Sequence, residues 1–464
     1  MAISFGSINT GLPKDIVNQL MEAERIPINK MEARKGKIAD KKKVLGDLIG
    51  LVTKVRDEVV KTQGAKNLRE LKVETNNNYI GLEIDKNIAK PGTNQIEVME
   101  LAQKSTELSS GFPDRNETYV GVGYIQYEKP NGESREVYID PENATLDGIA
   151  KVINADESSG LTATVINDGS GSDKPFRLAL SVSGTGDGNK AKFPYFYFID
   201  GDYDFYLEHE RPASNAKIKF NGFDIEYPTN KIDDLIPGAV IDLKKAKPGE
   251  EFGINISEDI QAVSLKISNF IESINGVLSF IKQQNALDQS SDTSRTLGGD
   301  SVLQSLESRL RGMIFEDIIT SQGYRRAGDL GVSFQRSGLL QIDNKRFENF
   351  LAKDYGLVTE ILVGRFDPVT KTKSSGLIDN VQKVIDSSLR TPDGLLQSRN
   401  NTFKGNIDQI DRQIAQKNRF LDQKEKNLKD KFSRLESTIS KIKNQGAGLA
   451  AMGAAGGGNV TQLG

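Results

Sequence analysis

The sequence has no cysteine, no tryptophan and a single histidine, His209, among its 464 residues. The absence of cysteine excludes disulfide bonds, thiol nucleophiles and zinc sites built on thiolates. With one histidine, a serine–histidine–aspartate arrangement could be built only on His209. Nothing in the composition points to an enzyme, so we expect no catalytic residues, no bound metal and no cofactor.

Long apolar runs and an excess of either charge are also missing. No stretch reaches the ~18 apolar residues of a membrane-spanning helix. Residues 1–18 lack the basic region and the continuous apolar core of a cleaved signal peptide. With 61 basic and 64 acidic residues, the net charge of -3 gives no electrostatic argument for a nucleic acid or an anionic membrane as partner.

What the chain does contain is a seven-residue apolar period near each end. The C-terminal column is Ile407, Ile414, Leu421, Leu428, Leu435 and Ile442, and the N-terminal column is Met31, Ile38, Leu45, Val52 and Val59. A sustained period of seven predicts a helix that supercoils against a partner, since an isolated long helix is marginal in water. We expect the two helices to form an antiparallel leg, with Val52 near Ile410. The alternative is two unrelated helices within an ordinary domain.

Proline and lysine positions refine this interpretation. Pro27 predicts a break between a long helix, from about Ile28 to Thr62, and a short amphipathic segment before it. That segment carries the candidate docking residues Ile16, Val17, Leu20 and Met21. The lysines at 417, 424 and 431 predict either a solvated flank or pairs with acids of a neighbouring helix.

Between the two helices the pattern changes to period two, with glycine- and proline-containing turns, which is typical of antiparallel strands. The predicted fold class is therefore α+β multidomain, with long terminal helices forming a coiled-coil or helix-bundle leg that carries inserted β-rich head domains. The expected segments are an N-terminal disordered lead and leg helix (1–70), a β-rich head domain (71–115 with 212–257), a second inserted β-rich head domain (116–211), return helices of the leg domain (258–394), a C-terminal coiled-coil helix (395–445) and a disordered Gly/Ala tail (446–464).

Residues 193–206 include eight aromatic side chains. One interpretation is a strand and turn whose mostly buried rings fill a small β core; the other is a contact between subunits. Asp200, Asp202 and Asp204 alternate as in a calcium loop, but Phe205 and Arg211 stand where such a loop needs glycine and a bidentate acid. We therefore expect a solvated acidic turn and, at His209, a surface residue.

Several short motifs occur in the order found in one known family. They include Gly-Leu-Pro-Lys-Asp-Ile-Val-Asn-Gln-Leu-Met-Glu-Ala-Glu-Arg-Ile-Pro at 11–27, the flagellin-like repeat at 145–154 and 160–169, Lys-Phe-Asn-Gly at 219–222, Arg-Thr-Leu-Gly-Gly-Asp at 295–300, Ser-Gly-Leu-Leu-Gln-Ile-Asp at 337–343 and Gly-Leu-Leu at 394–396. Over nearly its full length the chain resembles the bacterial flagellar filament cap family, also called hook-associated protein 2 or FliD.

The resemblance implies a secreted structural protein at the distal filament tip. It implies a homo-oligomeric ring that retains exported flagellin and promotes its folding and insertion during elongation. Flagellin, hook-associated junction proteins and a cytoplasmic export chaperone binding the C-terminal region are the implied partners, and export is through the flagellar type III apparatus. Two alternatives stay open: another exported axial protein, such as a hook–filament junction protein or minor flagellin, and a surface adhesin with a ligand-binding β-rich head.

Overall fold

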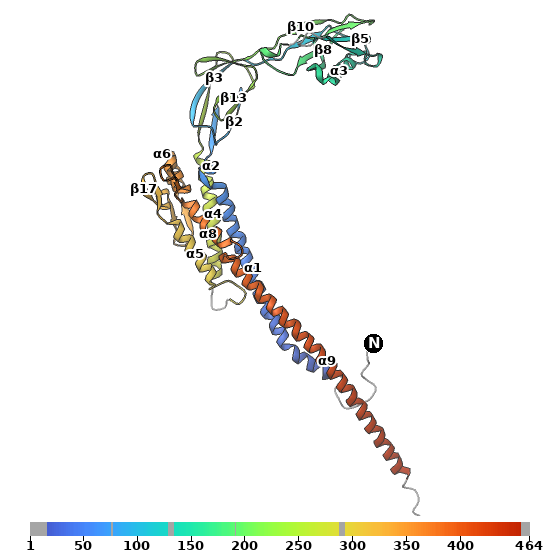
Figure 1. Ribbon diagram of the computed structural model, residues 1–464, viewed down its shortest axis with the longest axis vertical. Helices are drawn as coiled ribbons and strands as arrows, with labels where there is room; N and C mark the ends of the chain where they lie inside the picture. The colour runs from blue at the N-terminus through green and yellow to red at the C-terminus, as the bar shows by residue number, and fades with distance from the viewer. Residues whose placement is uncertain (1–15, 76–77, 129–133, 191, 287–292, 456–464) are drawn as a thin grey trace, which may run out of the picture. The chain divides into compact units, whose positions relative to one another are not determined.

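The computed structural model describes residues 16–75, 78–128, 134–190, 192–286 and 293–455. The chain divides into two compact units (Figure 1). Unit 1 combines the two ends of the chain, Met1–Leu68 and Ser264–Gly464, and unit 2 is the intervening Arg69–Val263. The described helices and sheets confirm the predicted mixture of long terminal helices and antiparallel β-structure.

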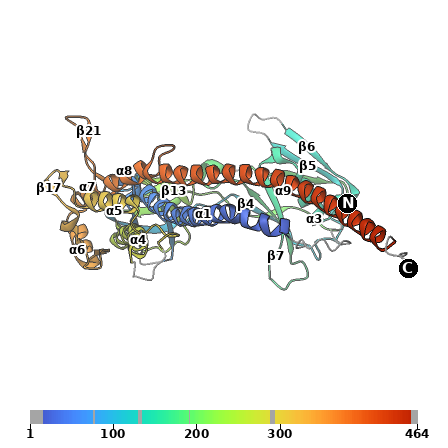
Figure 2. The ribbon, with the colours of Figure 1, turned by 90° about the horizontal axis from the view of Figure 1, so that it is seen from below.

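Unit 1 is built around α1 (Ile16–Thr62) and α9 (Leu395–Ala455), which run side by side in both views (Figures 1 and 2). Two ion pairs define their direction: Lys35 pairs with Asp411, and Glu24 pairs with Lys424. As residue numbers fall on α1, those of the partners rise on α9, so the predicted antiparallel pairing is confirmed.

The rest of unit 1 covers the C-terminal half of α1. Its helices are α2 (Gly64–Leu68), α4 (Ile260–Asn285, whose first turn belongs to unit 2), α5 (Ser301–Ile314), α6 (Asn344–Lys353), α7 (Tyr355–Val363) and α8 (Leu377–Leu389). Three hairpins join them: β16–β17 (Ile318–Thr320, Gly323–Arg325), β18–β19 (Val332–Phe334, Leu340–Ile342) and β20–β21 (Phe366–Asp367, Thr372–Lys373). The α8 helix lies against α1, α5 and α7, and its buried Val381 and Ile385 belong to the common core.

A short turn that contains Gly394 joins α8 to α9, and the Gly394 amide donates to the Arg390 carbonyl oxygen. A Cβ atom at this position would lie 2.5 Å from the carbonyl oxygen of Arg390, a distance that only a glycine tolerates here. The Gly-Leu-Leu motif recognised in the sequence therefore marks a close backbone contact at the start of the long C-terminal helix.

Two sheets of unit 2 share one core. The first has the order β1 (Leu71–Thr75), β15 (Phe252–Glu258), β3 (Gly92–Glu100), β11 (Ala216–Phe220), β12 (Phe223–Tyr227), and the second has the order β13 (Lys231–Ile236), β14 (Ala239–Leu243), β2 (Ile80–Ile84). Ile96 and Ile218 of the first sheet meet Ile241 of the second in a cluster that excludes water.

A second core lies between two further sheets and one helix. The sheets are β10 (Leu207–Arg211), β4 (Thr106–Ser109), β8 (Phe176–Val182), β7 (Leu161–Asn167) and β6 (Ser134–Ile139), β5 (Gly123–Glu128), β9 (Tyr195–Phe198), and the helix is α3 (Leu146–Ala155). Thr145 caps α3 by accepting a hydrogen bond from the Gly148 amide, as its sequence position predicts. Most strands around each core come from the segments expected for the two head domains. β4 is an exception, because it falls in the segment expected for the first domain but pairs with β8 and β10 around the second core. The domain boundaries stay a prediction.

Three expectations from the sequence are wrong. Helix α1 continues through Pro27, so residues 16–26 are not a separate segment. The missing hydrogen bond at Pro27 is offset by packing, because Met21 and Ile28 on either side of it are both buried in one cluster with Leu421 of α9. Likewise, α9 extends to Ala455, so disorder does not begin at residue 446; alanine is the strongest helix former and dominates this stretch. Residues 1–15 and 456–464 of the predicted lead and tail lie outside the described residues.

The third error concerns the register of the leg. Lys35, not Val52, lies at the level of Asp411 and hence of Ile410. Val52 is 17 residues further along α1, about 25 Å at 1.5 Å per residue. It contributes instead to the core of unit 1, where it is fully buried. A seven-residue period fixes which helix face is buried but leaves every whole-heptad shift equally compatible with the pattern.

The aromatic segment 193–206 is only half buried. Phe196 is 8% exposed and Phe193, Phe198 and Phe205 pack against the same core, but all four tyrosines point outward. Their exposures are 67% for Tyr195, 57% for Tyr197, 36% for Tyr203 and 56% for Tyr206. The expectation of mostly buried rings is thus correct for phenylalanine alone, because strand alternation sends neighbouring side chains to opposite faces.

Candidate functional site

A small apolar cluster holds the N-terminal part of α1 against α9, outside the core of unit 1. This part of the two helices is called the free half of the leg. Met21 and Ile28 on α1 and Leu421 on α9 are each no more than 5% exposed. Val17, Met31, Ile414 and Leu428 surround them and are half-buried. This cluster is far smaller than the core of unit 1, so the two helices are joined here by a narrow seam.

The predicted seam residues do not form one uniformly buried line. On α1, Leu45, Val52 and Val59 are fully buried, whereas Met31 and Ile38 are half-buried. On α9, Leu421 is buried, Ile407, Ile414 and Leu428 are half-buried, and Leu435 and Ile442 are exposed. Phe403 and Ile410, which begin a second column in the sequence, are also buried. Beyond Leu421, burial of this column therefore falls towards the C-terminal end of α9.

The reason for this decline is the antiparallel register. Glu24 pairs with Lys424, so the first residue of α1, Ile16, stands near the level of residue 432. The apolar column nevertheless continues: Leu435 is 46% exposed, Ile442 is 62% exposed and Leu449 is 71% exposed. Sequence reasoning omitted Leu449, although it extends the same spacing by one heptad. Among the described residues, no helix covers these three side chains.

The candidate docking residues lie in the first turns of α1. Leu20 is 44% exposed, whereas Met21 is 5% exposed and belongs to the seam with α9. Val17 is half-buried against that seam, and the side chain of Ile16 lies outside the described part of the chain. Leu20 is thus the member of the set that faces away from the leg.

Ion pairs connect α1 and α9 at two levels. Nζ of Lys35 lies 2.5 Å from Asp411, and Nζ of Lys424 lies 2.7 Å from Glu24, where its hydrogen bond lowers the pKa of the carboxyl. All four side chains are 37–45% exposed, so each pair contributes little to stability. Lys424 is one of the three lysines at seven-residue spacing, while Lys417 and Lys431 are exposed.

A more buried pair fastens the beginning of α9 to α5. Nη2 of Arg399 donates to Oδ2 of Asp300 at 2.6 Å, and the Asp300 side chain is only 8% exposed. The other oxygen of Asp300 accepts from the Val302 amide and caps α5. The Arg399 guanidinium also lies over the ring of the buried Phe403, 4.7 Å from its centroid. The start of the leg is therefore fixed rigidly to the core of unit 1.

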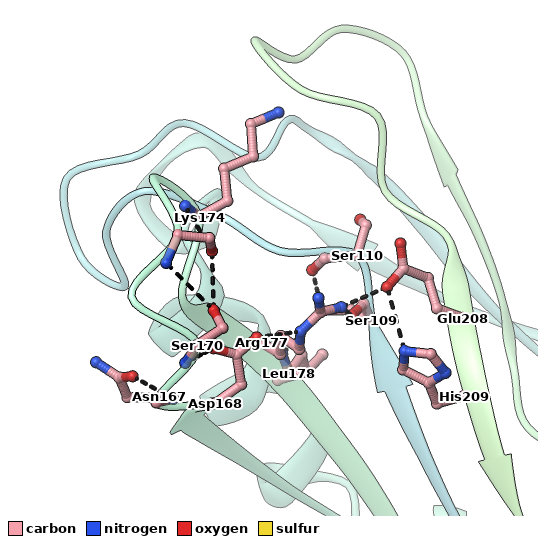
Figure 3. A network of polar contacts seen from close by, with 12 residues as sticks. Ser109, Ser110, Asn167, Asp168, Ser170, Lys174, Arg177, Leu178, Glu208 and His209 are labelled. Carbon is pink, nitrogen blue, oxygen red and sulfur yellow. Dashed lines mark hydrogen bonds and ion pairs between the residues drawn. The ribbon is translucent and has the colours of Figure 1, made fainter.

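The strongest polar network of unit 2 surrounds Arg177 on β8 (Figure 3). Its guanidinium donates to Asp168 at 2.8 Å, to the Ser109 carbonyl oxygen at 2.9 Å and to Glu208. The hydrogen bond from Arg177 lowers the pKa of Asp168 to about 2, and it also lowers the pKa of Glu208. Ser109 lies on β4 and Glu208 on β10, whereas Asp168 lies in the loop between β7 and β8. Arg177 therefore fastens β4, β8, β10 and this loop together.

The weak chemical motifs of the sequence have structural explanations. His209 lies beside Glu208 (Figure 3) and is 67% exposed, which confirms a surface position. Asp200 accepts hydrogen bonds from the Val122 amide and the Tyr119 hydroxyl, as a turn-forming residue does. Within the described ranges, no three histidine or acidic side chains are grouped as a metal ion requires, and no helix is long and apolar enough to cross a membrane.

Comparison with known proteins identifies the family. The model of the flagellar hook-associated protein 2 C-terminus matches residues 213–444, and that of the N-terminus matches residues 11–105. The first of these alone spans half of the chain. The chain belongs to the flagellar hook-associated protein 2 family. The matched segments contain both leg helices up to residue 444, together with the strands around the first core of unit 2.

Individual members of the hook-associated protein 2 family are similar to this chain over much of its length. The A-type flagellar hook-associated protein 2 of Pseudomonas aeruginosa is 23% identical over 432 residues, which is 87% of each chain. The Salmonella typhimurium relative is 23% identical over 323 residues, 63% of this chain and 66% of that one.

A solved structure of a flagellar cap protein is similar to this chain in fold. The D1-D2-D3 domains of the Escherichia coli flagellar cap protein FliD cover 78% of this chain and 100% of their own at a TM-score of 0.56 and 19% identity. The FliD structure from Bdellovibrio bacteriovorus is 47% identical but covers 36% of this chain and 95% of its own, with a TM-score of 0.34.

Family membership confirms several expectations from the sequence. The recognised family and the fold class are as predicted, and the protein is a structural component of the bacterial flagellum, namely of its filament cap. The alternative of a different axial protein is set aside, because both hook-associated protein 2 models match in their expected order. An adhesive role has no support from these relatives.

Proposed function

We propose that copies of this chain form a ring at the distal tip of the filament, hold exported flagellin beneath it and promote flagellin folding and insertion. Family membership supports the capping role, and the structure of the leg supports a way for the cap to attach to the filament. Unit 1 supplies a rigid base from which α1 and α9 extend. Unit 2 would then supply the head that closes the tip above the incoming subunit.

The observation that carries the proposal is the exposed column of Leu435, Ile442 and Leu449. A helix with an apolar residue in every heptad is stable in water only when a partner covers that face. Neighbouring legs and the helices of filament subunits are partners of suitable shape, and Leu20 on α1 provides a further exposed apolar contact beside this end of the leg.

The modest strength of these contacts suits a cap that must move at each insertion. The seam between α1 and α9 has only a small buried cluster, and the side chains of the ion pair beside it, Glu24 and Lys424, are 44% and 37% exposed. Several weak sites on a ring bind tightly together while each one can release and rebind separately. A single large fixed interface would instead hold the cap in one position.

Two further partners follow from the same proposal. Hook-associated junction proteins would precede the cap on the growing structure and provide its first docking surface. A cytoplasmic export chaperone would bind the C-terminal region before type III export and cover the apolar column of α9. Covering that column in the cytoplasm would prevent association of legs before they reach the tip.

The test uses a strain whose only copy of this chain carries Leu435→Asp with Ile442→Asp. The control strain carries Ser433→Asp with Asn444→Asp, which adds the same charge on exposed polar positions of the same helix. We expect the first strain to secrete the variant but to release unassembled flagellin and build few filaments. The control should swim normally.

Both purified variants should melt within ~1 °C of the original protein, because all four positions are exposed or at the helix surface. Measurement of secreted variant by immunoblot separates a docking failure from an export failure. Normal filaments in the Leu435→Asp and Ile442→Asp strain would show that this column is not the docking surface.

A further inference from the structure

One face of the three-stranded sheet β6–β5–β9 is lined with tyrosines. Tyr124 on β5 lies directly opposite Tyr138 on β6 and Tyr197 on β9, so the three form one row across the sheet. In the next row, Gln126 lies between Glu136 and Tyr195. The opposite face of the same strands carries Ile125, Ile139 and Phe196 into the core.

The tyrosines are well exposed. Tyr124 is 38% exposed, Tyr138 50%, Tyr195 67% and Tyr197 57%. The rings of Tyr124 and Tyr138 are 5.3 Å apart between centroids and are tilted by 51°. None of the four phenolic hydroxyls has a hydrogen-bond partner among the described residues, so each is available to a ligand.

The area of this surface indicates the size of its partner. With on the order of 200 Å² for a tyrosine, these exposures leave roughly 400 Å² of aromatic surface. A specific protein–protein contact buries about 800 Å² on each partner, twice as much. Patches of about 300–600 Å² are nevertheless the size at which exposed apolar surface is often functional. The four rings alone thus supply about half of such a contact, and they are large enough to bind a small ligand.

The chemistry of the face narrows the ligand further. Apart from the rings, this face presents Ser134, the Gln126 amide and the Glu136 carboxylate. The basic residue described on these strands, Arg135, alternates to the other face and pairs with Asp156. Sugars combine a C–H face, which packs on aromatic rings, with hydroxyls that donate to carboxylates and accept from phenols and amides. A carboxylate without a compensating cation disfavours anionic ligands. Sialylated and sulfated glycans are therefore disfavoured, and uncharged ones are favoured.

We propose that the outward face of β6–β5–β9 is a binding platform for neutral oligosaccharides. The row of three tyrosines spans two strand spacings, about 9.5 Å, so one bound chain contacts more than one ring. Tyr195, Gln126 and Glu136 supply the hydrogen bonds along the second row. Binding by one copy is independent of the proposed capping function; the ring would add avidity, because it presents several faces at once.

The experiment uses the purified full chain and four neutral probes: cellotetraose, chitotetraose, maltotetraose and mannotetraose. Binding is followed by calorimetry and by tyrosine difference absorption, since the chain has 12 tyrosines and no tryptophan. We expect at least one probe to bind. The double variant Tyr195→Thr and Tyr197→Thr should then bind it at least tenfold more weakly, and a sialylated or sulfated tetrasaccharide should bind no variant.

Threonine preserves strand propensity at these edge positions, and unchanged urea midpoints would show that the fold is kept. The matched control is Tyr324→Thr on β17, a tyrosine that is 73% exposed in unit 1 and should have no effect. Tyr124→Phe keeps the ring and should lose less affinity than Tyr124→Thr.

Three results would overturn the proposal: no binding of any neutral probe at millimolar concentration, equal binding by the double variant, or preference for the anionic probes. A change in sedimentation of the double variant without any sugar binding would assign the face to contact between copies of this chain. Filament formation by the double variant should be normal, which separates failure here from failure of the cap proposal.

Discussion

Lys424 on α9 donates a hydrogen bond to Glu24 on α1 over 2.7 Å, although 400 positions separate the two residues in the sequence. Together with the pair of Lys35 and Asp411, it shows the register of the leg. That register determines where α1 ends against α9 and hence how much of the apolar column on α9 is left uncovered.

The register can be tested directly by cross-linking, because the chain has no cysteine of its own. Cysteines introduced at Glu24 and Lys424 should be joined efficiently within one chain by a short thiol-reactive reagent. The control places the second cysteine at Lys431, one heptad further and about 10.5 Å along the helix. Digestion and mass spectrometry measure both yields, and a higher yield at Lys431 would contradict the register.

Neighbouring positions 420 and 421 should respond very differently to the same substitution. Leu421 is 3% exposed in the cluster with Met21 and Ile28, whereas Phe420 is 57% exposed. Leu421→Asp should destabilise the free half of the leg by about 2–4 kcal/mol, because it buries an unpaired charge. Phe420→Asp should change stability by less than about 0.5 kcal/mol.

The difference between Leu421→Asp and Phe420→Asp is measured by hydrogen exchange of peptides from the first turns of α1 and by helicity from circular dichroism. Equal protection in the two variants would show that the seam is not formed in solution.

Asp300 should contribute more to the stability of unit 1 than an exposed carboxylate does. It caps α5 and accepts from Arg399, so Asp300→Ala removes both interactions and should cost about 2–3 kcal/mol. Asp300→Asn keeps an oxygen for the cap and should cost about half as much. Asp393→Ala is the control, since its pair with Arg390 is 61–66% exposed. Urea unfolding followed by circular dichroism ranks the three variants, and a cost for Asp393→Ala equal to that of Asp300→Ala would refute the assignment.

The Arg177 network predicts an acid-sensitive contribution in unit 2. The hydrogen bond from Arg177 lowers the pKa of Asp168 from its ordinary 3.8 to about 2. A depressed pKa means that the folded state favours the ionised carboxylate, so the stabilisation is complete above pH 4 and is lost as the pH falls towards 2. Asp168→Asn should therefore lower the urea midpoint at pH 5 and have little effect near pH 2.

Asp173→Asn, an exposed neighbour in the same loop, is the control and should follow the original protein at every pH. A constant difference between Asp168→Asn and the original protein from pH 2 to pH 6 would show that the charge of Asp168 is not the cause.

Much of the architecture could be predicted from periodicity. The columns through Leu45 and Leu421 predict two long paired helices, and the period-two pattern around Ile125 predicts a strand with one buried face; both are observed. These features depend on local chemistry that every window of the sequence carries. The candidate seam was predictable only in part. Leu421 belongs to the predicted columns, whereas Met21 and Ile28, the buried seam residues on α1, do not.

The features that could not be predicted depend on distant contacts. Proline at position 27 disfavours a helix locally, and only the burial of Met21 and Ile28 against α9 explains why α1 continues. The burial gradient along α9 depends on the length of α1 and on the register of the two helices, which the pair of Glu24 and Lys424 shows. A heptad pattern contains neither. The split between buried phenylalanines and exposed tyrosines in 193–206 needed the pairing of β9 with β5.

The pairing of the first and last strands of unit 2, β1 and β15, affects how freely the segment between them can change in length and sequence. β1 pairs along its whole length with β15, with Leu71 opposite Glu258, and Arg69 forms an ion pair with Glu258. Once β1 and β15 have paired, the long segment between them adds no more loop-closure entropy to the pairing of α1 with α9 than a short turn would. An insertion closed in this way can be lengthened, shortened or exchanged for an unrelated one, while α1 and α9 still find each other at the same cost.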